Sequence, residues 1–155
     1  MKEILILNTK DAPISHKNEH AKYEYGKRSI VPHRFAEQCK VFVYEVPPKK
    51  AAYPYHYHLK NEEVFYIISG QGLLKTPAGD KEVSAGDFCF FPANENGAHK
   101  LINTSETEML AYIDFSTEND IDIAFYPDSG KIGVWGKNVN QVYKTSHQAE
   151  YYDGE

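Results

Sequence analysis

Turn-forming residues interrupt the middle of this chain at short and regular intervals. Clusters such as Pro47-Pro48, Ser69-Gly70 and Ala85-Gly86-Asp87 recur about every 8–12 residues. The segments between them are short and rich in β-branched and aromatic side chains, which favour strands over helices. No long stretch has the 3.6-residue periodicity of an amphipathic helix. This pattern predicts an all-β fold, an antiparallel sandwich or barrel with little helix.

The predicted strands cover residues 41–46, 53–58, 63–69, 72–76, 81–83, 88–91, 98–103 and 109–115. Before them, the more polar segments 11–20 and 26–29 are interpreted as loops, within an arm that wraps the barrel or pairs at its edge. After residue 115 we expect irregular chain with one tight turn at YPDSGK and one short IGVW strand. The polar tail is expected to cover an open sheet edge, because an unpaired edge invites aggregation.

The length of 155 residues fits one domain with a single core. We expect this domain to span residues 1–155, with a barrel core at about 41–115, an N-terminal arm over 1–40 and a C-terminal extension over 116–155. The net charge of −5 and the lack of a basic run longer than Lys49-Lys50 predict no nucleic acid and no membrane as partner. The apolar run at residues 4–7 is too short for a signal peptide or a membrane span, so we expect a cytoplasmic protein.

Two histidines separated by one residue, His56 and His58, begin a candidate metal site. Side chains alternate between the two faces of a strand, so both imidazoles project to one side, about 7 Å apart along the backbone. Glu63 opens the next predicted strand in phase with its large apolar residues, which puts the carboxylate on the inward face. Glu62 falls on the opposite face and is rejected as a ligand.

A third histidine, His99, begins the strand that follows the Asn96-Gly97 loop. The complete predicted ligand set is His56, His58, Glu63 and His99. Three imidazoles and one carboxylate suit one divalent transition metal such as Mn, Fe, Co, Ni or Zn, and the absence of a thiolate argues against a structural cysteine–zinc site. If the metal is five- or six-coordinate, four protein ligands leave a position open for a substrate, dioxygen or an activated water.

These residues lie in two motifs that resemble the signatures of the cupin superfamily. The family patterns are G-x5-H-x-H-x3,4-E-x6-G and G-x5-P-x-G-x2-H-x3-N. The chain has His56-x-His58-x4-Glu63-x6-Gly70 and Gly86-x5-Pro92-x4-Gly97-x-His99-x3-Asn103. It departs from the patterns at Lys50, which replaces the opening glycine, and in the loop between Pro92 and His99, which is two residues longer. The resemblance covers about residues 41–115 and implies a small RmlC-like jelly roll, or double-stranded β-helix, that binds metal.

The resemblance also implies a metal-dependent enzyme that acts on a small polar organic molecule. Cupins include dioxygenases, oxalate-type decarboxylases, sugar-phosphate isomerases and metal-free epimerases, and the ligand set favours the first three. The alternative is a non-catalytic ligand-binding or sensor protein with the same metal. An enzyme needs a titratable residue within reach of metal and ligand, whereas a binder needs only apolar walls. A homodimer is expected from the edge-strand argument and from the resemblance.

Strand phase divides the large side chains near the site into two groups. The residues expected to face inward, as barrel core and pocket floor, are Phe65, Ile67, Phe88, Phe90 and Leu101. The residues expected to face away from the metal, toward another sheet or subunit, are Tyr55, Tyr57 and Tyr66.

Other residues near the motifs have both a structural and a functional interpretation. Asn103 is either a turn former or a residue that orients a ligand. Lys49 and Lys50 are interpreted as solvated loop residues, with attraction of an anionic substrate as the alternative. Cys39 and Cys89 are too few for a disulfide framework and fit a reducing compartment. Cys89 lies close enough to the motifs for a redox or ligand role to stay open.

Overall fold

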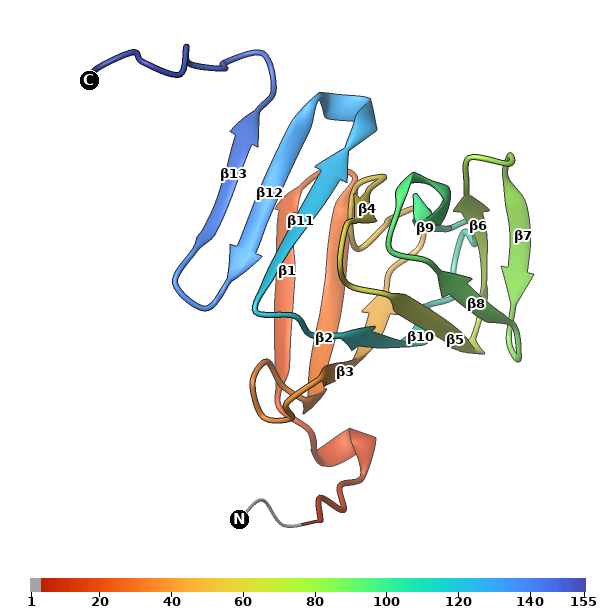
Figure 1. The fold of residues 1–155 in the computed structure, drawn as a ribbon. Helices are drawn as coiled ribbons and strands as arrows, with labels where there is room; N and C mark the ends of the chain where they lie inside the picture. The colour runs from red at the N-terminus through yellow and green to blue at the C-terminus, as the bar shows by residue number, and fades with distance from the viewer. Residues whose placement is uncertain (1–3) are drawn as a thin grey trace.

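The computed structural model describes residues 4–155 and is almost entirely β, with 51% of residues in strands and 6% in helical turns (Figure 1). This confirms the predicted all-β fold. Residues 1–3 of the expected N-terminal arm lie outside the described residues. The strands are β1 Ile14–His20, β2 Tyr23–Val31, β3 Cys39–Val46, β4 Tyr57–His58, β5 Glu63–Ser69, β6 Gln71–Lys75, β7 Lys81–Ser84, β8 Phe88–Phe91, β9 Lys100–Asn103, β10 Leu110–Thr117, β11 Ile121–Tyr126, β12 Lys131–Gly136 and β13 Asn140–Lys144. Short 3₁₀ turns occur at η1 Thr9–Asp11, η2 Glu95–Gly97 and η3 Pro127–Ser129. Within residues 4–155, no helix has the length and apolar character needed to cross a bilayer.

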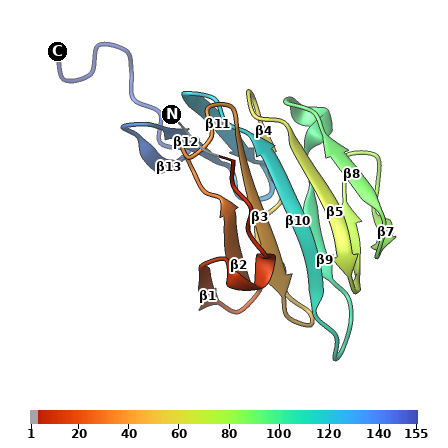
Figure 2. The same cartoon turned by 90° about the horizontal axis from the view of Figure 1, so that it is seen from below.

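The larger sheet has the strand order β1-β2-β3-β10-β5-β8, and all its neighbouring pairs are antiparallel. Figure 2 shows these strands side by side as one twisted layer. Alternate residues of β10 are buried, which puts Asp114 and Ser116 on the inner face. The register places Asp114 between Phe42 of β3 and Phe65 of β5, and Ser116 opposite Glu63. The inner face of the sheet therefore carries acidic and hydroxyl groups at this end of β10.

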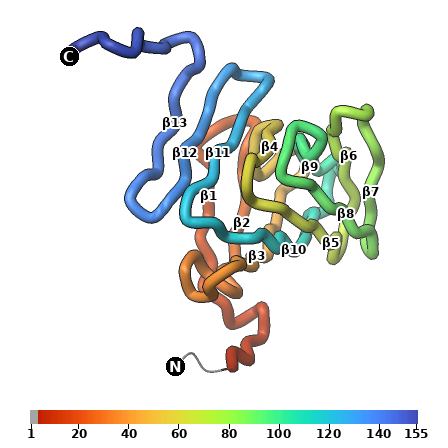
Figure 3. Tube along the Cα trace, in the orientation of Figure 1, coloured from red at the N-terminus to blue at the C-terminus, as the bar shows by residue number. Residues whose placement is uncertain are grey.

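Two smaller sheets, ordered β13-β12-β11-β4 and β7-β6-β9, form the opposite layer. They meet where His56 and His99 form an antiparallel bridge. The N–H of His56 donates to the carbonyl of His99 at 3.1 Å, and the N–H of His99 donates back at 2.9 Å. Figure 3 follows the chain as it passes repeatedly between the layers, from β3 through β4 to β5 and from β8 through β9 to β10. This is the jelly-roll arrangement that the resemblance to cupins implies.

Apolar side chains from both layers fill the space between them. Along β10, the inward residues Leu110 and Tyr112 are at most 2% exposed and belong to this core, whereas the next two inward residues are Asp114 and Ser116. The core cluster consists of Phe42, Tyr44, Val46, Ala52, Phe65, Ile67, Leu74, Val83, Phe91, Leu101, Leu110 and Tyr112. Burial of each large apolar side chain stabilises the fold by about 1.5–3 kcal/mol. The core therefore ends on β10 where the polar inner face begins.

Most of the strands predicted within residues 41–115 are present. The predictions for 63–69 and 88–91 coincide with β5 and β8. The strand predicted over 53–58 is much shorter, because only Tyr57–His58 forms β4 and His56 pairs only through its bridge to His99.

The inward phase predicted for β8 is wrong. Phe88 and Phe90 are 68% and 55% exposed, whereas Phe91 is buried and Cys89 packs against the core. The register explains this difference, because Phe91 lies opposite Glu63 and cross-strand partners share a face. Pairing with β5 therefore decides which residues of this continuous apolar run face inward.

Both flanks of the barrel form strands where the sequence suggested loops. Segments 11–20 and 26–29 belong largely to the β1–β2 hairpin, so the loop interpretation is wrong, while pairing at the sheet edge is confirmed by the β2–β3 ladder. Strand β1 is exposed over its whole length and has no apolar alternation to mark it. The C-terminal extension is more regular than expected, because it forms β11, β12 and β13 and not one short strand. The polar tail after residue 144 forms no strand, and β13 is an exposed sheet edge, so the expectation that the tail covers an edge is wrong.

Candidate metal centre

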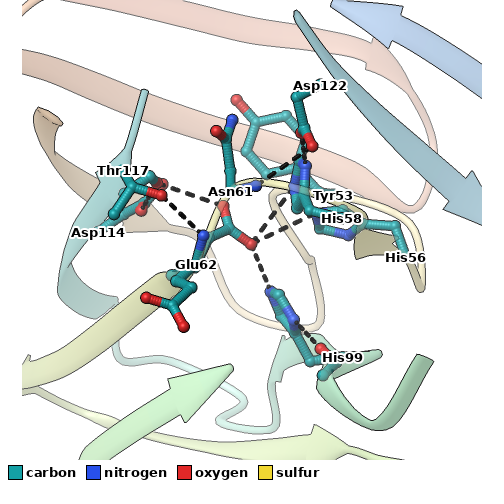
Figure 4. Close-up of polar contacts among 12 residues, drawn as sticks. Tyr53, His56, His58, Asn61, Glu62, His99, Asp114, Thr117 and Asp122 are labelled. Atoms are coloured by element: carbon teal, nitrogen blue, oxygen red, sulfur yellow. Dashed lines mark hydrogen bonds and ion pairs between the residues drawn. The ribbon is translucent and has the colours of Figure 1, made fainter. Parts of the chain in front are cut away.

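The four predicted ligands converge between the two layers. His56 and His58 come from the β4 segment, Glu63 opens β5 and His99 immediately precedes β9. Figure 4 shows the rings of His56 and His58 on one side and His99 on the other, turned toward a common point. All four side chains are at most 12% exposed. Glu62, rejected as a ligand by strand phase, is exposed.

The carboxylate oxygen Oε2 of Glu63 lies among three imidazole nitrogens. It is 3.4 Å from Nε2 of His99, 3.5 Å from Nε2 of His58 and 3.8 Å from Nε2 of His56. Glu63 Oε2 and His99 Nε2 are buried and have no hydrogen-bond partner among residues 4–155. Donor atoms held about 2.1 Å from one metal ion lie roughly 3.0–3.4 Å from each other. The donor atoms of His56, His58 and Glu63 all lie within 4.8 Å of one another, which fits a single transition metal ion. His99 adjoins this group through its 3.4 Å contact with Glu63.

Hydrogen bonds at the opposite ring nitrogens orient the histidines. Nδ1 of His56 lies 2.8 Å from the carbonyl of Pro54, and Nδ1 of His99 lies 2.9 Å from the carbonyl of Gly97. A carbonyl oxygen can only accept, so these Nδ1 atoms donate and each Nε2 presents a lone pair to the centre. Metal-binding histidines are typically held in this way.

Asp122 of β11 orients the third ring, because its carboxylate is hydrogen-bonded to Nδ1 of His58. Asp122 is 1% exposed and also accepts from the N–H groups of Lys60 at 2.8 Å and Asn61 at 3.2 Å. Sequence analysis missed Asp122, because its segment was interpreted as irregular. The available signal is its place at an inward position of the alternating segment around Ala124.

The longer loop before His99 forms the 3₁₀ turn η2. The side chain of Asn94 caps this turn by accepting from the N–H of Asn96 at 2.9 Å. A Cβ at Gly97 would lie 2.0 Å from the carbonyl oxygen of Pro92, so only glycine fits there. The displaced glycine of the motif thus lets the chain fold tightly and direct its carbonyl at His99.

Burial and proximity shift the pKa values within this cluster. Burial, followed by the neighbouring His99, lowers the pKa of His56 to about 3, so this ring is neutral. Burial alone raises the pKa of Glu63, but the three histidines outweigh it and hold that pKa at about 2. Burial lowers the pKa of His58, yet Glu63 and Asp122 outweigh this effect and raise the pKa overall. The cluster thus pairs the Glu63 carboxylate with an imidazole, His58, that holds its proton more firmly than an isolated histidine does.

A cavity of about 980 Å³ opens onto His56, His58 and Glu63. Other residues of its wall include Lys27, Lys40, Tyr53, Asn61, Asp114 and Tyr126. The volume lies within the range typical of sites for small organic molecules. The wall is formed by the inner face of the larger sheet and by both flanks of the barrel, so the flanks help to decide which molecule fits.

Asp114 is a buried acid in this cavity and is 6% exposed. The hydroxyl of Ser116 donates to Oδ1 of Asp114 at 2.7 Å and lies 3.4 Å from Oε1 of Glu63. Burial, followed by the negative charge of Glu63, raises the pKa of Asp114 to about 7. Sequence analysis missed this residue as well, although its phase with the apolar residue Tyr112 was the available signal.

The contacts of Asn103 and Lys49, which lie away from the metal cluster, decide between the structural and functional interpretations of these two residues. Asn103 is fully buried, and its amide donates to the carbonyls of Val46 at 2.9 Å and Glu108 at 2.8 Å, which favours the turn role. Lys49 forms a 2.6 Å ion pair with Glu106 and is a loop residue, as interpreted.

The outward tyrosines and Cys89 also lie apart from the metal cluster. Tyr57 stacks on Phe125 with ring centroids 5.1 Å apart, and Tyr66 is 43% exposed on the outer face. The ring of Tyr55 contacts the ammonium group of Lys75 at 4.4 Å. Burial and the charge of Asp87 raise the pKa of the Cys89 thiol, which disfavours the reactive thiolate.

Comparison with known protein families gives a match to one family over the middle of the chain. Residues 42–115 match the sequence model described as the cupin domain. The oxalate-binding protein of Thermotoga maritima is 28% identical over 72 residues, which are 46% of this chain and 58% of that protein. The chain thus spans little more than half the length of this curated relative.

Solved structures share the fold over more of the chain. A sugar phosphate isomerase from Silicibacter pomeroyi has a TM-score of 0.82 at 15% identity, covering 96% of this chain and 98% of that chain. A candidate sugar phosphate isomerase from Acidithiobacillus ferrooxidans has a TM-score of 0.80 at 21% identity, covering 94% and 95%. A predicted oxalate decarboxylase from Thermotoga maritima has a TM-score of 0.64 at 19% identity, covering 74% and 100%. Residues 42–115 thus match the cupin domain, and the chain as a whole shares the jelly-roll fold of these solved structures.

Proposed function

We propose that this protein binds one divalent transition metal through His56, His58, Glu63 and His99. The proposal is supported by the convergent Nε2 atoms, by the fixed ring orientations and by the unpaired buried atoms Glu63 Oε2 and His99 Nε2. The mixed nitrogen and oxygen donors suit Mn, Fe, Co, Ni or Zn. A metal at this site supplies Lewis acidity that polarises a carbonyl or hydroxyl oxygen of the substrate.

We infer further that the protein is an isomerase, which moves a proton between neighbouring carbons of a small hydroxy-carbonyl compound. Asp114 is the observation that carries this inference. It lines the same cavity as three of the metal ligands, and Ser116 links it to Glu63. A pKa of about 7 allows one carboxyl group to accept and to return a proton near neutral pH. A protein that only binds its ligand has no need of such a group.

The proposed proton transfer is balanced within the substrate. The Asp114 carboxylate takes the proton from the carbon next to the carbonyl, and the electron pair of that C–H bond shifts toward the carbonyl oxygen. Asp114 then returns the proton to the former carbonyl carbon, while the hydroxyl proton passes to the other oxygen. The product is an isomer of the substrate, and the Asp114 carboxylate is restored. Ser116 keeps the carboxyl group oriented through its hydrogen bond.

The comparisons support isomerisation over oxalate chemistry. The two structures named as sugar phosphate isomerases cover 96% and 94% of this chain, whereas the two oxalate-named proteins cover 46% and 74%. A two-carbon dianion would fill only a small part of a cavity of about 980 Å³. The name of the oxalate-binding relative keeps a non-catalytic binding protein as the second candidate.

The test is deuterium exchange catalysed by the metal-loaded protein in D₂O, followed by NMR over a panel of aldose and ketose phosphates. We expect deuterium at the carbons next to the carbonyl together with interconversion of the isomers. Asp114→Asn should keep its metal and lose the exchange, while Asp128→Asn, an exposed control, should behave as wild type. Carbon dioxide release from oxalate, oxygen consumption, or tight binding without exchange would each contradict the proposal.

A further inference from the structure

Two lysines on strands of the larger sheet line the cavity without a carboxylate partner. Lys27 lies on β2 and Lys40 on β3, and both contribute to the cavity wall. Neither ammonium group makes a hydrogen bond or an ion pair with any residue in the described range 4–155. The Nζ atom of Lys27 lies 3.8 Å from the ring centroid of Phe42, a buried residue of the same wall. Burial lowers the pKa of Lys27, Asp114 opposes this, and Lys40 lowers it further, as expected for two like charges that share a cavity.

Among the other cationic groups around the cavity, His33 and Arg34 already have partners, whereas the exposed Lys137 has no side-chain partner among residues 4–155. His33 lies 2.9 Å from a carboxylate oxygen of Glu118, and the guanidinium of Arg34 donates to the carbonyl of Lys137. Away from the cavity, Lys49 and Lys75 are paired with Glu106 and Asp128. Three unpaired ammonium groups around one cavity are unexpected in a chain of net charge −5, where carboxylates outnumber cations. Of these three, only Lys27 and Lys40 lie on strands of the larger sheet. They leave positive charge available to a ligand.

The strand register places these lysines across the sheet from the metal cluster. Lys40 lies opposite Ser116 of β10, and Ser116 lies opposite Glu63 of β5. Two inter-strand spacings of about 4.8 Å separate the backbone of Lys40 from that of Glu63 by about 10 Å. Lys27 joins from the next strand, where it lies opposite Tyr44. Across the inner face of the sheet, the two lysines on β2 and β3 come first, Asp114 on β10 lies next, and the predicted metal ligand Glu63 lies on β5.

We propose that Lys27 and Lys40 bind the phosphate group of a phosphate monoester, whose hydroxy-carbonyl end lies at Asp114 and the metal cluster. The identity of the reacting end rests on the proposed function, whereas the anion site does not. A phosphate dianion balances two ammonium groups and offers acceptors to both. Both lysines precede residue 42, the first residue of the matched cupin domain. The N-terminal arm therefore supplies the charge that selects the substrate.

Calorimetric titration of the full chain with inorganic phosphate tests this site. We expect metal-free and metal-loaded wild type to bind phosphate, and Lys27→Met with Lys40→Met to bind it at least about tenfold more weakly, equivalent to about 1.4 kcal/mol. Lys27→Arg with Lys40→Arg should restore binding because it keeps both charges. Lys49→Met and Lys75→Met are matched controls outside the cavity and should bind as wild type. Thermal denaturation verifies that each variant is folded.

The outcomes separate this proposal from the proposed function. Phosphate binding that persists in the double methionine variant, or that requires the metal, would overturn the lysine site even if isomerase activity is found. Oxalate that binds the metal-free protein more tightly than phosphate would overturn the phosphate assignment. Lysine-dependent phosphate binding in a protein without deuterium exchange would uphold the anion site and reject the isomerase. In an active enzyme, the double methionine variant should raise KM more than it lowers kcat, because phosphate binding is equally strong before and during the reaction.

Discussion

Nδ1 of His58 is hydrogen-bonded to the carboxylate of Asp122, a residue 64 positions further along the chain. The contact is possible because β11 pairs with β4, where Ala124 lies opposite His58. Asp122 follows the matched cupin domain, which ends at residue 115. The C-terminal extension is thus part of the metal cluster and not merely a cover for the barrel.

Removing the charge of Asp122 is therefore predicted to weaken metal binding. In Asp122→Asn the imidazole of His58 becomes less basic and less firmly oriented, so we expect a loss of about 10- to 100-fold in metal affinity. Competition with a chelating indicator measures this affinity. Asp128→Asn, an exposed change in the same extension, should bind metal as wild type. Equal affinities for the two variants would show that Asp122 has no role in the metal cluster.

Metal content is predicted to depend on the histidines of the cluster. Wild type loaded with metal and dialysed should retain one metal per chain by elemental analysis, while His56→Ala with His58→Ala should retain little. His147→Ala, in the exposed tail, is the control. Wild type should also unfold at higher temperature with metal, since a ligand at 1,000 times its Kd stabilises a protein by about 4.1 kcal/mol. The prediction fails if the double variant keeps full metal content.

Asp114→Asn is predicted to stabilise the metal-free protein while it abolishes proton transfer. The pKa of Asp114 is about 7 in the folded chain and 3.8 as its ordinary value. Between these values the unfolded chain has lost a proton that the folded chain retains, so stability falls as the pH rises. At pH 8 the variant should gain up to about 4 kcal/mol in free energy of unfolding, and near pH 3 it should gain little. Urea unfolding at the two pH values measures the difference.

His56 is predicted to destabilise the metal-free protein in acid. Its pKa is about 3 in the folded chain and 6.5 as its ordinary value. The unfolded chain therefore gains a proton below pH 6.5 that the folded chain accepts only near pH 3, and stability falls across this range by up to about 1.4 kcal/mol per pH unit. His56→Gln should show a shallower decline in urea unfolding between pH 6.5 and 4.5. Asp114 contributes equally to both proteins, so its opposing effect cancels when the unfolding free energy of the variant is subtracted from that of wild type. Equal changes of unfolding free energy with pH in the two proteins would contradict the low pKa of His56.

The outer face of β5 and β8 is predicted to be a dimer interface. Tyr66, Phe88 and Phe90 are 43%, 68% and 55% exposed, and Tyr66 lies opposite Phe88. We propose that a second copy of the chain covers them, because exposed apolar patches of this kind mark interaction sites. Phe88→Ser with Phe90→Ser should shift sedimentation from the two-chain to the one-chain mass, and Tyr152→Ser in the exposed tail should not. Wild type sedimenting as a single chain would exclude the dimer.

The sequence predicts the orientation of a site residue most reliably where the residue lies in a strand with clear alternation of apolar and polar side chains. The alternation of β5 predicts that Glu63 and not Glu62 faces inward, and the structure buries Glu63 and exposes Glu62. The same rule failed in β8, where Phe88 and Phe90 belong to an unbroken apolar run. Such a run contains no internal signal of phase, so its two faces are decided only by the partner strand.

Residues that act through distant pairing could not be found from local pattern. Asp122 acquires its role because β11 pairs with β4, and Lys27 and Lys40 become neighbours of the cavity because β2 and β3 extend the larger sheet. These long-range relations are absent from any short stretch of sequence. Asp114 was closer to prediction, since its strand was found and only its inward phase was overlooked.

The main-chain bridge between His56 and His99 fixes the position of two predicted metal ligands relative to each other. The two backbone hydrogen bonds join His56 and His99 without the participation of any side chain. Lys27 and Lys40, which we propose to bind phosphate, take no part in that bridge. A substitution of Lys27 or Lys40 would therefore change the charge of the cavity without removing a hydrogen bond from this bridge.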